Sequence, residues 1–329
     1  MNGTWKSVLV IDPLPAMLAG GNPALEYFVR RDLLEQPVGP IESLWGLAEP
    51  RRLDEKQQAD GSWRYPGKAD HPAPNANYTL LETFRNLRVL IEMYGFQLPH
   101  PAIQKAAEYV FSCQTDEGDI RGILGNQYMP YYHAAILELL IKCGYAKDAR
   151  ILKGLDWLLS MRQADGGWIV PAQLVPPDQK TAQFWPSPPV QPDRTKPHSH
   201  LATGMVLPAF AAHPDYRQRP EVILAGQRLA ERLFQADKYY DRKAASYWLK
   251  FQFPFWWPSL VSALNALSLL GIDRQDHNFA RGLDWFVTNQ YPDNLWETGY
   301  GKGRNAQELR RWVGLAICRV LNRSYRNGI

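Results

Sequence analysis

A short phrase that recurs along the chain is the feature that most restricts its fold. Gln58–Trp63 reads Gln-Ala-Asp-Gly-Ser-Trp, and Gln163–Trp168 reads Gln-Ala-Asp-Gly-Gly-Trp. Looser copies of the phrase begin at three further glutamines, Gln114, Gln235 and Gln290. Successive copies start about 50 to 70 residues apart, which is enough chain for one helical hairpin and its loops. The period therefore indicates a repeat architecture in which each helical pair packs against its neighbours.

Each phrase lies between two kinds of helical pattern. The segment before a phrase has apolar residues at helical spacing, as Leu152, Leu155 and Leu159 do before Gln163. The segment after a phrase is apolar on most of its faces, which is typical of a helix that is buried on most faces. We expect these buried helices at Tyr78–Tyr94, Tyr131–Cys143, Leu201–Ala212, Pro258–Leu270 and Leu309–Leu321.

Alternation of amphipathic and apolar helices favours an all-α chain folded as an α/α toroid, a double ring whose inner layer is formed by the apolar helices. Outer helices are expected at Ile103–Cys113, Val222–Phe234 and Phe279–Asn289, and the opening segment adds Leu25–Leu34 and Ile41–Leu47. This pattern predicts about ten to twelve helices in hairpin repeats. We expect residues 1–329 to form a single domain, with a proline-rich loop insertion at 169–198.

Composition narrows the partners and the compartment. The chain has 37 Lys and Arg against 33 Asp and Glu and lacks a dense basic run, which argues against nucleic acid as a partner. No run of about 18 apolar residues is long enough for a transmembrane segment. Cys113, Cys143 and Cys318 lie far apart in apolar segments, as free thiols of a cytoplasmic protein would. The oligomeric state stays open.

Two segments carry a resemblance to known families. Lys153–Leu159 together with Gln163 and Trp168 resembles the QW repeat of squalene and oxidosqualene cyclases, and Arg281–Phe286 with Gln290 and Trp296 is a looser match. Phe253–Trp257 resembles the inner helices of protein prenyltransferase β subunits. The chain is most similar to short bacterial prenyltransferase-like proteins of unsettled function. The resemblance implies a toroid over roughly Leu25 to Leu321 and a structural role for the repeat residues Gln58, Trp63, Gln163, Trp168, Gln290 and Trp296.

The catalytic motifs of these relatives are missing from the sequence. No D-x-D-D run is present to protonate a terpenoid, and Cys318 has no neighbouring Asp and His to complete the zinc set of a prenyltransferase. The resemblance therefore implies a scaffold without implying an activity, and whether the chain is an enzyme stays open. No cofactor is evident from the sequence, although histidines that hold zinc are conceivable.

The proline-rich insertion leads into His198 and His200 at the start of an apolar helix. Long loops on rigid scaffolds often carry function. Imidazole can act as an acid or base near neutral pH or ligate a metal, so His198, His200 and the more distant His133 are candidate catalytic residues. In the alternative interpretation His198 caps the helix or contacts water, while His200 packs in the interior.

Aromatic and amide side chains stand at the other junctions where a loop enters a buried helix. If these helix starts face one side, the side chains converge on the mouth of a cavity and bind a substrate there. The candidates are Asn75, Asn77, Tyr78, Tyr131, Tyr132, Phe255, Trp256 and Trp257. In the alternative interpretation the asparagines cap helices and the rings pack between them.

Two other recurring features have a structural explanation. The aspartates of the phrases, Asp60, Asp116, Asp165 and Asp293, are expected to stabilise turns and helix starts rather than to form catalytic pairs. Paired arginines such as Arg310 and Arg311 are expected on solvated helix faces rather than in a diphosphate clamp.

Three functions stay open. The first is a prenyltransferase-like or terpenoid-cyclase-like protein that binds an apolar, isoprenoid small molecule in an aromatic-lined central cavity, with acid–base or metal chemistry from histidine. The second is a non-catalytic ligand-binding or interaction protein on the same scaffold. The third is a glycan-active toroid enzyme, which requires a carboxylate pair beside its cavity.

Overall fold

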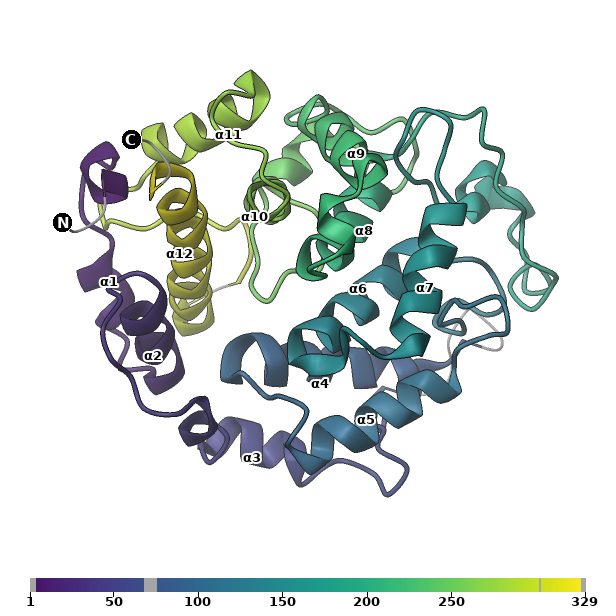
Figure 1. Ribbon diagram of the computed structural model, residues 1–329, viewed down its shortest axis with the longest axis horizontal. Helices are drawn as coiled ribbons and strands as arrows, with labels where there is room; N and C mark the ends of the chain where they lie inside the picture. Colours follow the sequence, from purple (N-terminus) through teal and green to yellow (C-terminus); the bar gives the residue numbers. More distant parts are fainter. Residues whose placement is uncertain (1–3, 68–75, 302, 327–329) are drawn as a thin grey trace. The chain divides into compact units, whose positions relative to one another are not determined.

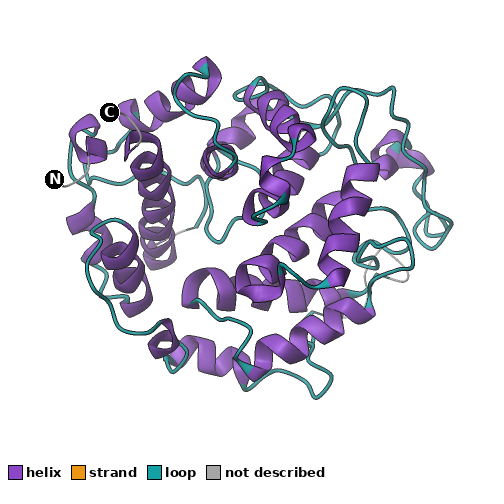
Figure 2. Cartoon of the chain, in the orientation of Figure 1, coloured by secondary structure: helices purple, strands orange, loops and turns teal. Residues whose placement is uncertain are grey.

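A computed structural model describes the chain except for residues 1–3, 68–75, 302 and 327–329. The described residues form twelve α-helices, several short 3-10 helices and one π-helical segment at Ile141–Tyr145. No β-strand occurs among them, as Figure 2 shows; only isolated bridges pair short pieces of backbone. The predicted all-α fold class and the predicted number of helices are confirmed.

The chain contains two compact units. Unit 1 comprises Met1–Pro40, Arg217–Asp237 and Arg242–Ile329, and unit 2 comprises Ile41–Tyr216 and Lys238–Asp241. Unit 1 thus joins segments from the two ends of the sequence. The single domain expected from the sequence, with an insertion at 169–198, stays a prediction.

Unit 2 contains six helices in two layers. In chain order they are α3 (Ala48–Asp54), α4 (Tyr78–Tyr94), α5 (Pro101–Ser112), α6 (Pro130–Leu140), α7 (Ala149–Ser160) and α8 (His200–Ala212). The apolar helix α6 packs against both α4 and α8, while α3 and α5 pack on α4, and α7 packs on α6 and α8. Helices α6 and α8 are apolar on most faces, as the repeat pattern predicts, whereas α4 is amphipathic and buries one face, so the expectation for Tyr78–Tyr94 was wrong.

Unit 1 is organised around the apolar helix α10 (Leu260–Leu269) and the long helix α12 (Gly303–Arg326), whose central residues Trp312–Cys318 are buried while its two ends are polar. Helices α9 (Pro220–Ala230) and α11 (His277–Thr288) pack against α10. On its other side α12 contacts the N-terminal elements η1 (Thr4–Val8), α1 (Leu14–Leu18) and α2 (Pro23–Asp32). Figure 1 shows α12 in yellow between the purple N-terminal helices and α10. Residues more than 270 positions apart, such as Asn322 and Asp32, are therefore hydrogen-bonded at 3.0 Å.

Several helices begin or end at residues other than those expected from the sequence. Helix α12 extends beyond the expected range Leu309–Leu321 at both ends, and the added residues are mostly polar. The expected helix at Ile41–Leu47 is instead a 3-10 helix, Ile41–Leu44, followed by α3. Helix α8 begins at His200 because the Ser199 side chain accepts the N–H of Ala202 at 3.2 Å. Ser199, rather than His198, is therefore the N-cap.

Three repeat tryptophans tie each phrase to the helix that precedes it. The indole N–H groups of Trp63, Trp168 and Trp296 each donate to a backbone carbonyl at 2.7 Å. The acceptors are the oxygens of Leu53, Leu158 and Phe286, each in the last turn of its helix. All three rings are buried. A single side chain thus fills the junction and satisfies a carbonyl that a helix end leaves open.

The glutamine that ties neighbouring hairpins stands one residue earlier than the sequence comparison suggests. The Gln57 amide donates to Gly61 at 2.9 Å and to Ala102, in the first turn of α5, at 2.8 Å. Gln114 does the same with Gly118 and Arg150, at 2.7 and 2.8 Å. Gln290 follows this pattern, bonding Asn294 at 3.0 Å and Ile11 at 2.7 Å. Gln57 therefore corresponds to Gln114 and Gln290.

Gln58 and Gln163 occupy the next position of the phrase. Gln58 is exposed, and its side-chain oxygen lies 2.9 Å from the hydroxyl oxygen of Ser62. Gln163 is buried and donates to the carbonyls of Asp193 and Lys196, at 2.7 and 2.9 Å. Gln163 thus anchors the proline-rich insertion instead of the next hairpin.

The aspartates of the phrases differ in their contacts. Asp60 accepts the backbone N–H and the hydroxyl of Ser62 at 3.0 and 2.7 Å, as expected of a turn residue. Asp293 forms a two-pronged ion pair with Arg310, which also donates to the carbonyl of Trp296 at 3.1 Å. Arg310 is only 6% exposed. The expectation that Arg310 lies on a solvated face was wrong, because the turn carboxylate compensates its buried charge.

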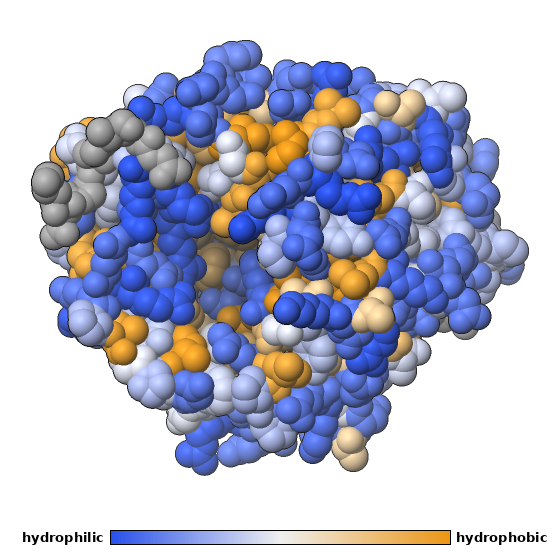
Figure 3. All heavy atoms as spheres, viewed as in Figure 1, coloured by the Kyte–Doolittle hydropathy of each residue, from blue (hydrophilic) through white to orange (hydrophobic). Residues whose placement is uncertain are grey.

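The hydropathy of the surface and of the helices bears on where the chain can reside. The face shown in Figure 3 is largely hydrophilic, with hydrophobic residues in small groups. None of the helices in the described part combines the length and the hydropathy that crossing a bilayer requires. Cys113, Cys143 and Cys318 are free thiols. The cytoplasmic location stays a prediction.

Candidate functional site

His133 is a buried link within the repeat. Its Nδ1 accepts the backbone N–H of Ile120 at 2.9 Å, and its Nε2 lies 3.1 Å from the carbonyl oxygen of Gly154. Two threonine hydroxyls fill the same position in other repeats, where Thr83 and Thr203 accept the N–H groups of Trp63 and Trp168. Both ring nitrogens of His133 are thus engaged by backbone groups. Burial lowers the pKa of His133 to about 4, so the ring is neutral at pH 7.

His198 forms a pair with one of the phrase aspartates. The Oδ2 atom of Asp165 lies 2.9 Å from Nδ1 of His198 and also accepts the backbone N–H of His198 at 2.8 Å. Burial raises the pKa of Asp165, but the hydrogen bonds from His198 outweigh it and hold this pKa below the usual value. A carboxylate on Nδ1 fixes the orientation of the ring and places a proton on that nitrogen.

The other nitrogen of His198 is buried. The side chain is 8% exposed, and its Nε2 has no hydrogen-bond partner among the described residues. An imidazole that a carboxylate orients through one nitrogen, while the other nitrogen has no partner, is an arrangement that acid–base groups use. His200, the first residue of α8, is also buried. Within the described part of the chain, no three His, Cys, Asp or Glu side chains are grouped so as to hold a metal ion.

A pocket of about 570 Å³ lies within unit 2 and contains two of the candidate substrate-binding residues. Tyr78 contributes from the start of α4 and Tyr131 from the first turn of α6. Leu124 and Met129, from the loop before α6, add apolar surface. The convergence of helix starts on one pocket, expected from the sequence, therefore applies to two of the aromatic candidates.

The proline-rich insertion forms another wall of this pocket. Val170, Ala172 and Pro177 add apolar atoms, and Trp185, from the middle of the insertion, adds an aromatic ring. Backbone bonds hold this wall in place, since the carbonyl of Trp185 accepts the N–H of Asn126 at 2.8 Å. The sequence marked the insertion as a candidate functional segment, but its wall residues were not among the predicted site residues.

One end of the pocket is polar. Lys180 donates to the hydroxyl of Tyr240, and its ammonium lies 4.6 Å from the centre of the Tyr240 ring. Asp241 and Gln173 complete this end. Burial lowers the pKa of Lys180, while the charge of Asp241 opposes that shift. The buried Oε1 of Gln173 has no hydrogen-bond partner among the described residues.

The remaining candidates have packing or capping contacts. Asn77 caps α4 by accepting the N–H of Leu80 at 2.9 Å. The Tyr132 ring packs against Phe84 and Tyr131. Phe255, Trp256 and Trp257 belong to unit 1 and do not line the pocket of unit 2; Arg242 lies 4.3 Å from the ring of Trp257. Asn75 lies outside the described residues.

No protein-family model and no curated protein matches the chain. Among solved structures, a protein from Actinoplanes aligns over 96% of this chain and 99% of its own, with 16% identity and a TM-score of 0.43. A polysaccharide lyase aligns over 91% and 89%, with 15% identity and a TM-score of 0.45. A variant of the type II terpene cyclase MstE from Scytonema, in complex with its product merosterolic acid A, aligns over 92% and 97%, with 14% identity and a TM-score of 0.34. These likenesses assign neither a family nor an activity.

Proposed function

We propose that the chain binds a mainly apolar small molecule of the isoprenoid class in the pocket of unit 2. The observation that carries the proposal is the lining, in which Tyr78, Tyr131 and Trp185 add aromatic surface to several aliphatic side chains. Aromatic and aliphatic surface favours branched hydrocarbon chains because both are removed from water on binding. A volume of about 570 Å³ lies in the usual range for small-molecule sites.

The polar end suits the head group of such a ligand. Lys180 supplies a positive charge, the Tyr240 hydroxyl lies beside it, and Gln173 adds an amide. A hydroxyl or diphosphate head group finds complementary partners there, while the hydrocarbon chain lies against the rings. Asp241 is the one carboxylate among the lining residues, so the lining does not provide the carboxylate pair that glycoside hydrolysis uses. Binding of an isoprenoid is therefore favoured over glycan chemistry.

A titration of the purified chain with farnesol, geranylgeraniol, their diphosphates and a neutral oligosaccharide tests the proposal. Isothermal calorimetry is expected to show saturable binding of the isoprenoids and none of the oligosaccharide. Trp185→Ala removes aromatic surface from the pocket and is expected to weaken isoprenoid binding about tenfold or more. Trp285→Ala is the matched control, since Trp285 is also half-buried but belongs to unit 1.

The head group is tested separately with Lys180→Met, which removes the charge and keeps an unbranched side chain. Binding of the diphosphates is expected to weaken more than binding of the alcohols. The proposal fails if no isoprenoid binds, if the oligosaccharide binds instead, or if Trp185→Ala behaves like its control.

A further inference from the structure

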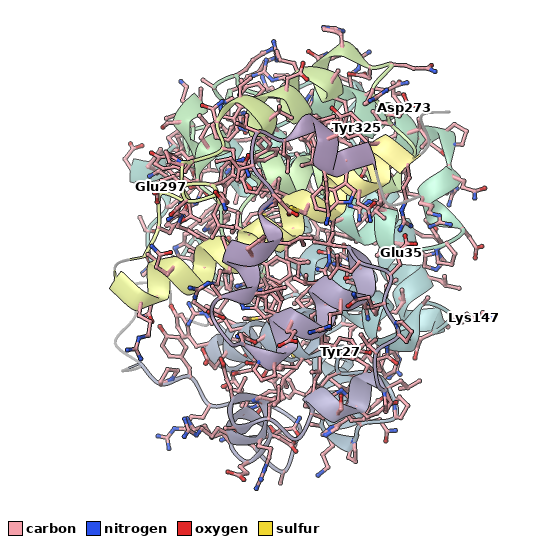
Figure 4. The ribbon with its side chains drawn as sticks, turned by 90° about the vertical axis from the view of Figure 1, so that its left-hand side faces the viewer. Tyr27, Glu35, Lys147, Asp273, Glu297 and Tyr325 are labelled. Atoms are coloured by element: carbon pink, nitrogen blue, oxygen red, sulfur yellow. The ribbon has the colours of Figure 1, made fainter. Side chains whose placement is uncertain are left out.

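A second pocket, of about 570 Å³, lies within unit 1 at the ends of α10 and α12. Its walls are Ser268 of α10, the loop Gly271–Gln275 and the last turn of α12. Asp273 and Tyr325, labelled in Figure 4, lie close to each other in that view. No residue of this pocket lines the pocket of unit 2.

The pocket is rich in arginine. Arg274, Arg323 and Arg326 line it, and Asp273 is the one carboxylate among the lining residues. Asp273 has a structural task, since its Oδ1 accepts the N–H of Gln275 at 2.9 Å in the turn before α11. The lining therefore carries more positive than negative charge.

Two of these arginines lack a carboxylate partner. Arg323 donates to the neutral oxygens of Ser268 and Asn265, at 3.1 and 2.5 Å. Arg274 stacks on the ring of Tyr325, with 4.5 Å from the guanidinium to the ring centre. Neither arginine forms an ion pair among the residues that the structure describes.

The charges of neighbouring arginines in the same unit are compensated by carboxylates. Arg319 pairs with Asp32 at 2.5 Å, and Arg326 pairs with Glu35. Asp32 is also paired with Arg31, so it has little capacity left for Arg323. Burial, helped by the charge of Arg319, lowers the pKa of Arg323 to about 10, against a raising effect of Asp32. Arg323 stays charged at pH 7 in surroundings that disfavour its charge, which an incoming anion would relieve.

We propose that this pocket binds a small organic anion through a phosphate or carboxylate group held by Arg323 and Arg274. The guanidinium group presents parallel donors that match both oxyanions, and the ring contact of Arg274 holds one donor set in place. The pocket is much larger than one phosphate group, so the ligand carries an organic part as well. This site shares no lining residue with the isoprenoid pocket.

Calorimetric titrations of the full chain with inorganic phosphate, diphosphate, ribose 5-phosphate and citrate, compared at one ionic strength, test the proposal. Saturable binding is expected for at least one of these anions. In a second series at increasing sodium chloride concentration, the affinity is expected to fall because the contacts are charged. Ribose 5-phosphate is expected to bind more tightly than inorganic phosphate if the phosphate group is the recognised one. Preference for citrate identifies a carboxylate ligand.

Arg274→Gln and Arg323→Gln are each expected to weaken binding about tenfold or more, because each removes a charged hydrogen-bond donor. Arg323→Lys keeps the positive charge but loses the parallel N–H donors of the guanidinium group. This variant is expected to fold and to bind the anion less tightly than the parent chain. Arg304→Gln removes a charge from an exposed position at the other end of α12 and is expected to leave the affinity unchanged. Circular dichroism verifies that each variant is folded.

Two results overturn the proposal. One is the absence of saturable binding for all four anions. The other is equal weakening by Arg304→Gln and Arg274→Gln, which indicates general attraction to a basic surface instead of a pocket. Within the part of the chain that the structure describes, the Arg274 side chain contacts the ring of Tyr325 and forms no ion pair. Arg274→Gln is therefore expected to fold, and it tests the proposal even if Arg323→Gln unfolds.

Discussion

At the residue scale, His133 and His198 show how one residue type takes different roles in different surroundings. His133 is held by backbone groups on both ring nitrogens, whereas His198 is held on one by Asp165. In the sequence both are histidines near the start of an apolar helix. The contacts of each nitrogen show the difference: both nitrogens of His133 are hydrogen-bonded, whereas Nε2 of His198 has no hydrogen-bond partner among the described residues.

The buried His133 makes stability depend on pH. Its pKa is lowered to about 4 in the folded chain and is about 6.5 in an unfolded one, so below pH 6.5 protons bind preferentially to the unfolded state. The stabilisation is fully present above about pH 6.5 and is lost as the pH falls towards 4, amounting to about 3 kcal/mol in free energy of unfolding. Urea unfolding at a series of pH values measures it.

A comparison of variants isolates this contribution. His133→Gln cannot titrate and is expected to show a smaller loss of stability between pH 6.5 and 4 than the parent chain. His277→Gln replaces an exposed histidine and is expected to follow the parent. Parallel pH profiles for the parent and His133→Gln contradict the prediction.

At the scale of elements, the glutamine ties explain how a hairpin is joined to the next one. Gln57→Ala removes two hydrogen bonds, to Gly61 and to Ala102, and is expected to lower the free energy of unfolding by about 1 to 2 kcal/mol. Gln58→Ala changes the adjacent, exposed glutamine and is expected to cost less than about 0.5 kcal/mol. Chemical denaturation of both variants decides between the two positions, and equal costs count against the register described above.

The tryptophan ties predict a second difference. Trp168→Phe keeps an aromatic ring but loses the indole donor to the carbonyl of Leu158, and is expected to cost about 1 to 3 kcal/mol. Trp285→Phe is the comparison variant: Trp285 lies in α11, the helix that precedes the phrase of Gln290, and its half-buried ring packs against Phe251. Melting temperatures of the two variants provide the comparison. An equal fall in both means that ring volume, and not the hydrogen bond, stabilises the junction.

At the scale of the whole molecule, the two compact units each contain a pocket of their own. The pocket of unit 2 is mainly apolar with a polar end, whereas that of unit 1 is lined by arginines. No residue is shared between the two linings, so the two proposals can fail independently.

This separation predicts selective effects of substitution. Trp185→Ala is expected to weaken binding of farnesol and to leave phosphate binding unchanged, while Arg274→Gln is expected to do the reverse. Calorimetric titration of both variants with both ligands measures the four affinities. Loss of both ligands in either variant indicates unfolding or a shared site and counts against two separate pockets.

Sequence patterns alone predict the helical class, the apolar helices α6, α8 and α10, and the positions at which successive hairpins join. These follow from local periodicity and from turn residues, and both act over a few neighbours along the chain. The repeat also located the buried tryptophans, because Trp63, Trp168 and Trp296 have the same local surroundings in each copy.

The folded chain is needed to see which glutamine ties the hairpins, which histidine nitrogens are hydrogen-bonded, and which side chains meet in a pocket. Gln57 and Gln58 are neighbours of one type, and the carbonyl of Ala102 that distinguishes them lies 45 residues away. Arg274 and Arg323 are likewise far apart in sequence, and so are Tyr131 and Trp185. Hydrogen bonding, burial and charge compensation depend on such distant partners, and a local pattern carries no information about them.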